Sequence, residues 1–114
     1  MLAVIFEVTP TAEGKEEYLK IAAELRGFLA NRDGFISIER FSSLTEEGKL
    51  VSLSFWRDEQ SIREWRNLME HRTAQRKGKR SLFTSYRIRV AKVIRDYTGT
   101  ERDEAPSDSR DVLG

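Results

Sequence analysis

The side chains best suited to chemistry on a small organic molecule gather in one segment, residues 56–80. This segment holds both tryptophans and the only histidine of the chain. His71 can exchange a proton near neutral pH without help, because a free imidazole has a pKa of about 6.5. Trp65 offers an indole that can stack on a planar substrate or fill the core. The two residues predict a pocket in which His71 moves a proton and Trp65 holds a ring.

The direction of His71 depends on the shape of the helix predicted over residues 59–77. At about 100° per residue, Trp65 and Met69 share one face of this helix, and His71 lies nearly opposite them. His71 is therefore exposed if the helix is straight. It turns inward only if the helix breaks near residues 66–68.

Further candidates lie on the predicted strands. Glu7 stands within an apolar run, where a buried and unpaired carboxylate is costly and needs a partner or a raised pKa. It can serve as a general base or as an anchor for a substrate hydroxyl; alternatively, it forms a salt bridge to Arg87 or Arg89 across the sheet. Tyr86 and Phe83 are expected to close the mouth of the pocket, although Phe83 also suits the core.

Composition excludes several other kinds of site. The chain has no cysteine, which removes thiolate metal sites, disulfides and cysteine nucleophiles. A single histidine and the lack of an acidic cluster with ligand spacing argue against a metal. The basic run at the end of the segment is expected to be a solvated helix end, or else to guide an anionic substrate; it consists of Arg72, Arg76, Lys77, Lys79 and Arg80.

The periodicity of apolar residues predicts the elements that position these side chains. Strands are expected over 2–9, 35–43, 49–56 and 86–97, and helices over 15–30 and 59–77. Gly34 is free to take a positive φ after the first helix, and Asp58, or alternatively Ser61, suits the N-cap of the second. The order β-α-β-β-α-β is that of the ferredoxin-like α+β fold, a four-stranded antiparallel sheet with both helices on one face.

The other face of this sheet is also expected to be apolar. The first strand is apolar on both sides, and the third carries Val51, Leu53 and Phe55 on one side. Two helices cover only one face, and a large exposed apolar patch usually marks an interface. We therefore expect a homodimer with sheets face to face. The alternative is a monomer whose open face is made partly polar by Ser52, Ser54 and the arginines of the fourth strand.

The whole chain has the size and charge of one small domain. Its 114 residues carry a formal net charge of +1, too little to predict a nucleic-acid partner. We expect a folded domain over 1–97 and a polar, acidic and flexible tail over 98–114. No apolar run approaches the roughly 18 residues of a membrane span. The N-terminus lacks the basic region and cleavage site of a signal peptide, so a cytoplasmic protein without a membrane partner is expected.

Four stretches of this framework resemble the antibiotic biosynthesis monooxygenase family: GFISIERFSSL, LSFWRDEQSIREW, HRTAQRKG and YRIRVAKVIRDY. The resemblance spans residues 2–97 and implies the dimeric α+β barrel, in which two sheets of a homodimer form a barrel. Each subunit would then have a pocket between its helices and its own sheet. Some members of the family are cofactor-independent monooxygenases that oxidise phenolic polyketide rings with molecular oxygen. Others bind and degrade haem.

Carried over residue by residue, the resemblance is partial. The polyketide-oxidising members place an asparagine, a tryptophan and a tyrosine on the second helix, where this chain has Ser61, Trp65 and His71. The haem-degrading members use an asparagine, a tryptophan and a histidine, where this chain has Glu7, Trp65 and Gln75. Glutamine is a poor ligand for haem iron beside a neutral imidazole. No cofactor is therefore expected.

The function expected from the sequence is a cofactor-independent monooxygenase acting on an aromatic or quinol-like small molecule. A non-catalytic module that binds or senses a small molecule on the same fold is the alternative, and haem binding is a third. In the first case the catalytic residues are His71 and Glu7, and the substrate-binding residues are Trp65, Tyr86, Ser61 and Phe83.

Overall fold

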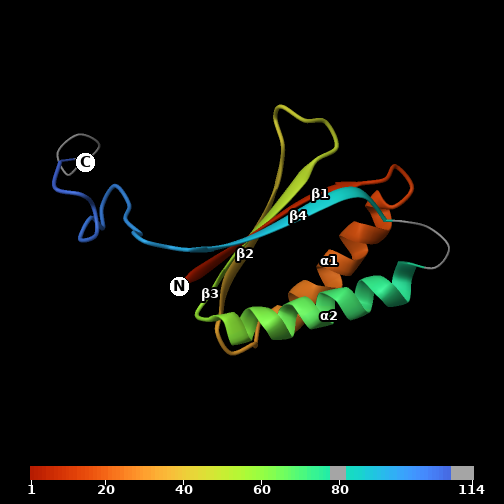
Figure 1. Ribbon diagram of the computed structural model, residues 1–114, viewed down its shortest axis with the longest axis horizontal. Coiled ribbons are helices and arrows are strands. Elements are labelled where there is room, and N and C mark those ends of the chain that lie inside the picture. The colour runs from red at the N-terminus through yellow and green to blue at the C-terminus, as the bar shows by residue number, and fades with distance from the viewer. Residues whose placement is uncertain (78–81, 109–114) are drawn as a thin grey trace.

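The computed structural model describes residues 1–77 and 82–108, and its elements follow the predicted order. These are β1 (Leu2–Pro10), α1 (Lys15–Leu29), β2 (Phe35–Ser42), β3 (Leu50–Trp56), α2 (Glu59–Lys77) and β4 (Phe83–Lys92). Both helices lie on one face of a four-stranded sheet (Figure 1). The predicted ferredoxin-like α+β class is confirmed. Within the described ranges, no helix is long and apolar enough to cross a membrane.

The strands lie in the order β2-β3-β1-β4, and each neighbouring pair is antiparallel. Phe6 of β1 is opposite Ser52 of β3 and Ile88 of β4, and Arg40 of β2 is opposite the same serine. Successive side chains of a strand point to opposite faces of the sheet. These four residues therefore share the face that the helices cover, which we call the helix-side face.

The core fills the space between this face and the two helices. Its central cluster joins the sheet to both helices and consists of Val4, Leu29, Trp56, Ile62 and Trp65. Trp56 is fully buried, and its indole N–H donates to the Ser54 hydroxyl at 2.8 Å. The monomer alternative placed Ser52 and Ser54 on the outer face of the sheet. That prediction is wrong, because both serines point to the same face of β3 as Trp56 and are buried under the helices.

Helix α1 packs on the sheet through the stripe that its spacing predicts. The buried residues are Tyr18, Ile21, Ala22, Leu25 and Leu29. Phe28 follows the same apolar spacing but is 43% exposed. At 100° per residue it lies about 60° from Leu25, at the edge of the stripe.

Helix α2 begins at a side-chain cap. The Oδ1 atom of Asp58 accepts from the backbone N–H of Ser61 at 3.0 Å and from its hydroxyl at 2.8 Å. These hydrogen bonds, together with one from Arg57, lower the pKa of Asp58 to about 2. Gly34 adopts φ +85° directly against the Ser61 side chain. The predicted N-cap and the predicted positive φ are both confirmed.

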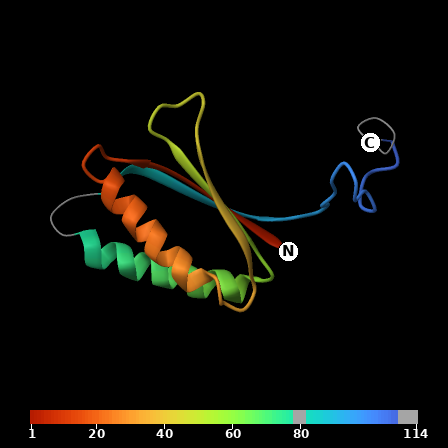
Figure 2. The same cartoon turned by 180° about the vertical axis from the view of Figure 1, so that it is seen from behind.

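Strand β4 starts earlier and ends earlier than the predicted range of 86–97. It covers Phe83–Lys92, and its last paired residue, Lys92, lies opposite Leu2 at the start of β1. Beyond this point β1 has no further residue to pair with, so the chain leaves the sheet after a final hydrogen bond from Val93 N–H to the Met1 carbonyl at 3.0 Å. Residues 93–108 then run away from the helices (Figure 2).

The face opposite the helices, which we call the open face, is apolar in its middle and charged at one end. Ile5, Leu53 and Phe55 are half-buried there. The open face includes Ala3, Ile5, Glu7, Val51, Leu53, Phe55, Arg87 and Arg89, and on β2 Glu39 and Phe41. No element of the described chain covers it (Figures 1 and 2).

Candidate functional site

A cavity of about 560 Å3 lies between the helix-side face and the two helices. Both helices and all four strands contribute to its lining. Its apolar part comes mainly from Phe6, Ile21, Ala22, Leu25, Met69 and Ile88. Small-molecule sites are usually clefts of this size, lined by apolar groups with a few placed polar ones. We call this space the helix-side cavity.

Four aromatic rings form one wall of the cavity. The ring centroids of Tyr18 and Phe83 are 5.6 Å apart, and they lie 6.5 and 6.3 Å, respectively, from the centroid of Phe6. The ring centroid of Tyr86 lies 6.1 Å from those of both Phe6 and Phe83. All five contacts are edge-to-face, the geometry that aromatic quadrupoles favour. We call these four residues the aromatic wall. They give the cavity flat surfaces against which a ring can lie.

Trp65 belongs both to the core and to the cavity. It is 5% exposed, and its ring lies 5.8 Å from that of Trp56, with the planes inclined by 48°. It is also among the lining residues. Trp65 therefore lies in both places considered for it, the core and the cavity lining, and its stacking on a substrate stays a prediction.

The polar groups of the lining come from separate elements. Arg40 and Ser52 face each other across the β2–β3 ladder, Tyr18 comes from α1, and Glu70 from α2. Burial raises the pKa of the Tyr18 phenol, and the nearby charge and hydrogen bond of Arg40 partly oppose this. The phenol therefore keeps its proton at neutral pH. The Nε atom of Arg40 is buried and has no hydrogen-bond partner in the described part of the chain.

The predicted site residues are only partly brought together. Trp65, Tyr86 and Phe83 line the cavity, with Tyr86 at its exposed edge, 64% accessible. Ser61 does not line it, because its hydroxyl is engaged in the cap of α2. The role of Ser61 as a substrate ligand stays a prediction without a contact to the cavity.

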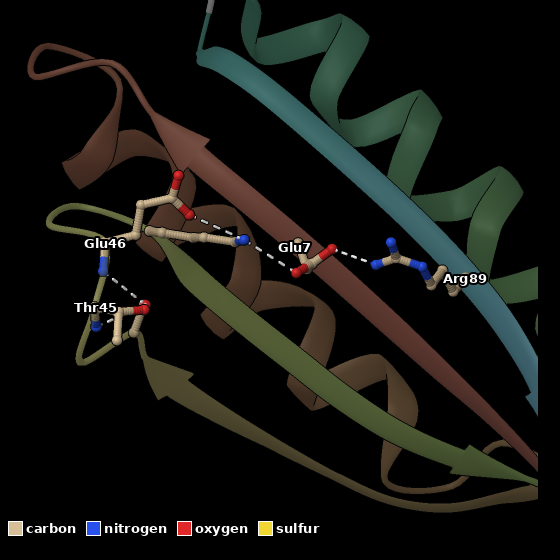
Figure 3. Close-up of polar contacts among 6 residues, drawn as sticks. Glu7, Thr45, Glu46 and Arg89 are labelled. Atoms are coloured by element: carbon tan, nitrogen blue, oxygen red, sulfur yellow. Dashed lines mark hydrogen bonds and ion pairs between the residues drawn. The ribbon is translucent and has the colours of Figure 1, made fainter.

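Glu7 lies on the open face, with the sheet between it and the helix-side cavity. Its carboxylate accepts from Lys49 Nζ at 3.0 Å and from Arg89 Nη1 at 2.6 Å (Figure 3). Lys49 also pairs with Glu46 at 3.0 Å. The hydrogen bond from Lys49 is the main reason that the pKa of Glu7 lies below its ordinary value; burial opposes this, and Arg89 adds to it. The salt bridge predicted to a fourth-strand arginine is confirmed.

His71 is exposed on α2, which is continuous over Glu59–Lys77. The break that would turn His71 inward is absent, so the imidazole is not among the residues that line the cavity. The preceding residue, Glu70, is. The catalytic roles expected for His71 and Glu7 thus remain predictions.

Sequence reasoning missed the polar lining of the cavity. Tyr18 follows the apolar spacing of α1, and no local sequence pattern marks Arg40 or Glu70 as cavity residues. The sequence does contain one signal for Ser52. Ser52 and Trp56 are an even number of residues apart and so point to the same face of the strand, and a tryptophan usually lies on the buried face of a half-exposed strand. The cross-strand register then brings Arg40 to the same side, but that register is a property of the fold.

The comparison with family models decides the relationship. The model described as antibiotic biosynthesis monooxygenase matches residues 1–77. The chain belongs to the antibiotic biosynthesis monooxygenase family. Within it, the chain is similar to a jasmonate monooxygenase from Pyricularia oryzae, at 45% identity over 101 residues, which are 89% of the chain and 47% of the relative. It thus spans about half the length of that protein. It is also similar to YqjZ from Bacillus subtilis, at 33% identity over 93 residues, covering 82% and 79% of the two chains.

Solved structures of this antibiotic biosynthesis monooxygenase fold superpose on the chain. Rv0793 from Mycobacterium tuberculosis has a TM-score of 0.70 at 18% identity, covering 85% of this chain and 98% of its own. A variant of SnoaB, a cofactor-independent oxygenase from Streptomyces nogalater, has a TM-score of 0.64 at 16% identity, covering 83% and 94%. A variant of MhuD with manganese protoporphyrin IX bound has a TM-score of 0.66 at 15% identity, covering 86% of this chain and 99% of its own. At these identities the likeness shows the fold alone.

Among the described side chains, the lining of the cavity offers no imidazole to a haem iron, because His71 is exposed and is not one of the lining residues. The position matched to the haem-ligating histidine, Gln75, lies outside the described side chains. The described residues also contain no group of three His, Cys, Asp or Glu side chains that would hold a metal ion.

Proposed function

We propose that this family member is a monooxygenase, or the catalytic part of one, that oxidises a small and largely apolar organic molecule in the helix-side cavity. The observation that carries the proposal is the cavity itself, about 560 Å3 in volume, with an aromatic wall and Trp65 in its lining. The similarity to a named monooxygenase at 45% identity supports the reaction class.

The proposed substrate is aromatic or quinol-like. The aromatic wall and Trp65 present ring faces and edges to the cavity, and offset or edge-to-face contact with a planar ring is favourable. The relative from Pyricularia oryzae is named for jasmonate, so jasmonate belongs in the substrate panel beside anthrones and quinols.

The proposed chemistry needs no cofactor when the substrate has an acidic C–H beside an aromatic or carbonyl group. A base removes the proton, the carbanion reduces O2 and captures it as a peroxide, and loss of water leaves a ketone. Overall, a methylene group and one molecule of oxygen give a carbonyl group and one molecule of water, and the carbon supplies all four electrons. A simple hydroxylation would in addition require an external two-electron reductant.

The proton acceptor is proposed to stand on α2. Glu70 provides a carboxylate at the cavity, and His71 is the base expected from the sequence. General-base catalysis requires the base within hydrogen-bond reach of the proton, or one water away. Glu70 meets this requirement better, because it is part of the lining whereas His71 is turned outward.

Oxygen uptake with anthrones, quinols and jasmonate tests the proposal, with Glu70→Gln and His71→Gln as variants. We expect uptake with at least one substrate, a loss of about 100-fold in rate for Glu70→Gln and little change for His71→Gln. The reverse order would return the role to His71. No uptake with any member of the panel would remove the proposed reaction.

We also propose that two copies pair through their open faces. The half-buried Ile5, Leu53 and Phe55 form an apolar centre that no described element covers. Equilibrium sedimentation should give twice the monomer mass, and Leu53→Lys should give the monomer. A wild-type monomer at micromolar concentration would contradict this pairing.

A non-catalytic binding module is the second candidate. The exposure of His71 favours it, because the only imidazole of the chain then takes no part in the cavity. Tight binding of panel compounds without any oxygen consumption or new product would select this function.

A further inference from the structure

The least expected side chain in the helix-side cavity is Arg40. It stands on β2 opposite Ser52, on the helix-side face, and contributes to the lining. Its Nε is buried and has no hydrogen-bond partner among the described residues. No ion pair joins Arg40 to an acidic side chain within residues 1–77 and 82–108. By contrast, Arg32, Arg57 and Arg89 pair with carboxylates near the surface.

A buried guanidinium N–H without an acceptor is unfavourable, since its hydration is lost and nothing replaces it. The guanidinium stays protonated at any physiological pH, so the group cannot escape this cost by becoming neutral. Its planar set of donors matches a carboxylate, which accepts two parallel hydrogen bonds from it. The geometry of Arg40 therefore suits an acceptor that is not part of the described chain.

The surroundings of Arg40 reinforce this choice. The Tyr18 phenol lies beside the guanidinium and retains its proton, so it can donate a second hydrogen bond to the same acceptor. Glu70 is the acidic member of the lining, but it is exposed, so water screens its charge. An anion placed at Arg40 would have its apolar remainder next to the aromatic wall.

We propose that Arg40, assisted by Tyr18, anchors an anionic oxygen of the substrate, a carboxylate in the first place, inside the helix-side cavity. The inference rests on the proposed function only in taking this cavity as the substrate site. It adds a substrate class, small apolar acids, and a residue that determines specificity.

A matched pair of probes tests the anchor. 2-Naphthylacetate and 2-naphthylacetamide have the same skeleton and nearly the same size, and only the first is charged. By isothermal titration calorimetry, the wild-type protein should bind the acid at least about tenfold more tightly than the amide. Arg40→Met and Arg40→Gln should bind both probes equally, and Arg40→Lys should keep part of the preference. Tyr18→Phe should reduce it by a smaller factor.

The control removes the same charge elsewhere. Arg87→Met acts on the open face, opposite Glu7 in the β1–β4 ladder, and should keep the full preference for the acid. Thermal melting of each variant establishes that it is folded. Two variants at Arg40 keep the test valid if one of them does not fold.

Failure of the anchor and failure of the proposed reaction give different results. Equal binding of acid and amide by the wild type, binding of neither, or an unchanged preference in Arg40→Met overturns the anchor. Oxygen uptake by the wild-type protein on a neutral anthrone tests the reaction independently. A preference for the acid that depends on Arg40, in a protein that consumes no oxygen, would sustain the anchor and remove the monooxygenase.

Discussion

The indole rings of Trp56 and Trp65 lie 5.8 Å apart and tie the end of β3 to the first turns of α2. Trp56 is completely buried, whereas Trp65 has the core on one side and the helix-side cavity on the other. The fold and the site thus share one contact. A substitution that weakens this contact is expected to lower both the stability of the protein and its affinity for a ligand.

Truncation of Trp65 should separate these two effects. Trp65→Ala removes a buried indole and should lower the free energy of unfolding by about 3–5 kcal/mol. Trp65→Phe keeps a ring against Trp56 and should cost clearly less. Urea unfolding followed by circular dichroism measures both. A loss below about 1 kcal/mol for Trp65→Ala would show that α2 does not depend on this contact.

Three glycines separate backbone strain from side-chain contact: Gly34 in the turn before β2, with Gly48 and Gly27 as references elsewhere. Gly34 has φ +85°, and an added methyl group would collide with Ser61, so Gly34→Ala should be destabilising through both strain and contact. Gly48 has φ +81° but open space around it, so Gly48→Ala should show the strain alone. Gly27 lies within α1 with nothing near it, and Gly27→Ala should stabilise the protein by roughly 0.5–1 kcal/mol. Thermal melting should rank the variants in that order; equal losses at Gly34 and Gly48 would remove the contact with Ser61 from the explanation.

The ion pairs of Glu7 should make stability depend on acid pH. The pKa of Glu7 is lowered on folding, so its contribution is present above the ordinary value of 4.5 and is lost as the pH falls through the lower folded value. Glu7→Gln should reduce the urea midpoint at pH 7 and have a smaller effect at pH 3. Glu39→Gln is the control, because Glu39 lies opposite Leu53 on the same face and is exposed. An effect of Glu7→Gln that is the same at both pH values would contradict a contribution from the carboxylate charge.

Tyr18 should act at the opposite end of the pH scale. Burial raises its pKa above 10, so the folded state favours the neutral phenol. The stabilisation is complete below the unfolded pKa of about 10 and is lost as the pH rises through the folded value. Tyr18→Phe should flatten the fall in stability above pH 10. Absorbance at 295 nm should show a late-ionising tyrosine that is missing in Tyr18→Phe.

Local patterns were sufficient to predict the order of the elements, because each depends on its own periodicity and end signals. The apolar stripe of α1, the Asp58 cap and the turn at Gly34 are of this kind. The faces of β3 were harder to predict. Leu53 and Phe55 are more apolar than Ser52 and Ser54, yet it is the serines that lie under the helices.

The polar lining of the cavity depends on relationships between distant segments. Tyr18 and Arg40 meet only because α1 packs over the β2–β3 ladder, and no local pattern encodes that approach. The direction of His71, by contrast, follows from a local pattern. Helical periodicity places His71 opposite Trp65 and Met69, and because α2 is continuous, the side chain stays exposed and does not line the cavity.

The alternation of β1 has a consequence for how this chain can vary. Phe6 supplies a ring to the cavity, and its neighbour Glu7 supplies a charge to the reverse of the sheet. A single inserted residue before this pair would exchange their directions, since register has a period of two. The carboxylate of Glu7 would then point into the apolar core, and the ring of Phe6 would point toward solvent. Descendants of this sequence can freely lengthen the loops, but at this strand they must add residues two at a time or not at all.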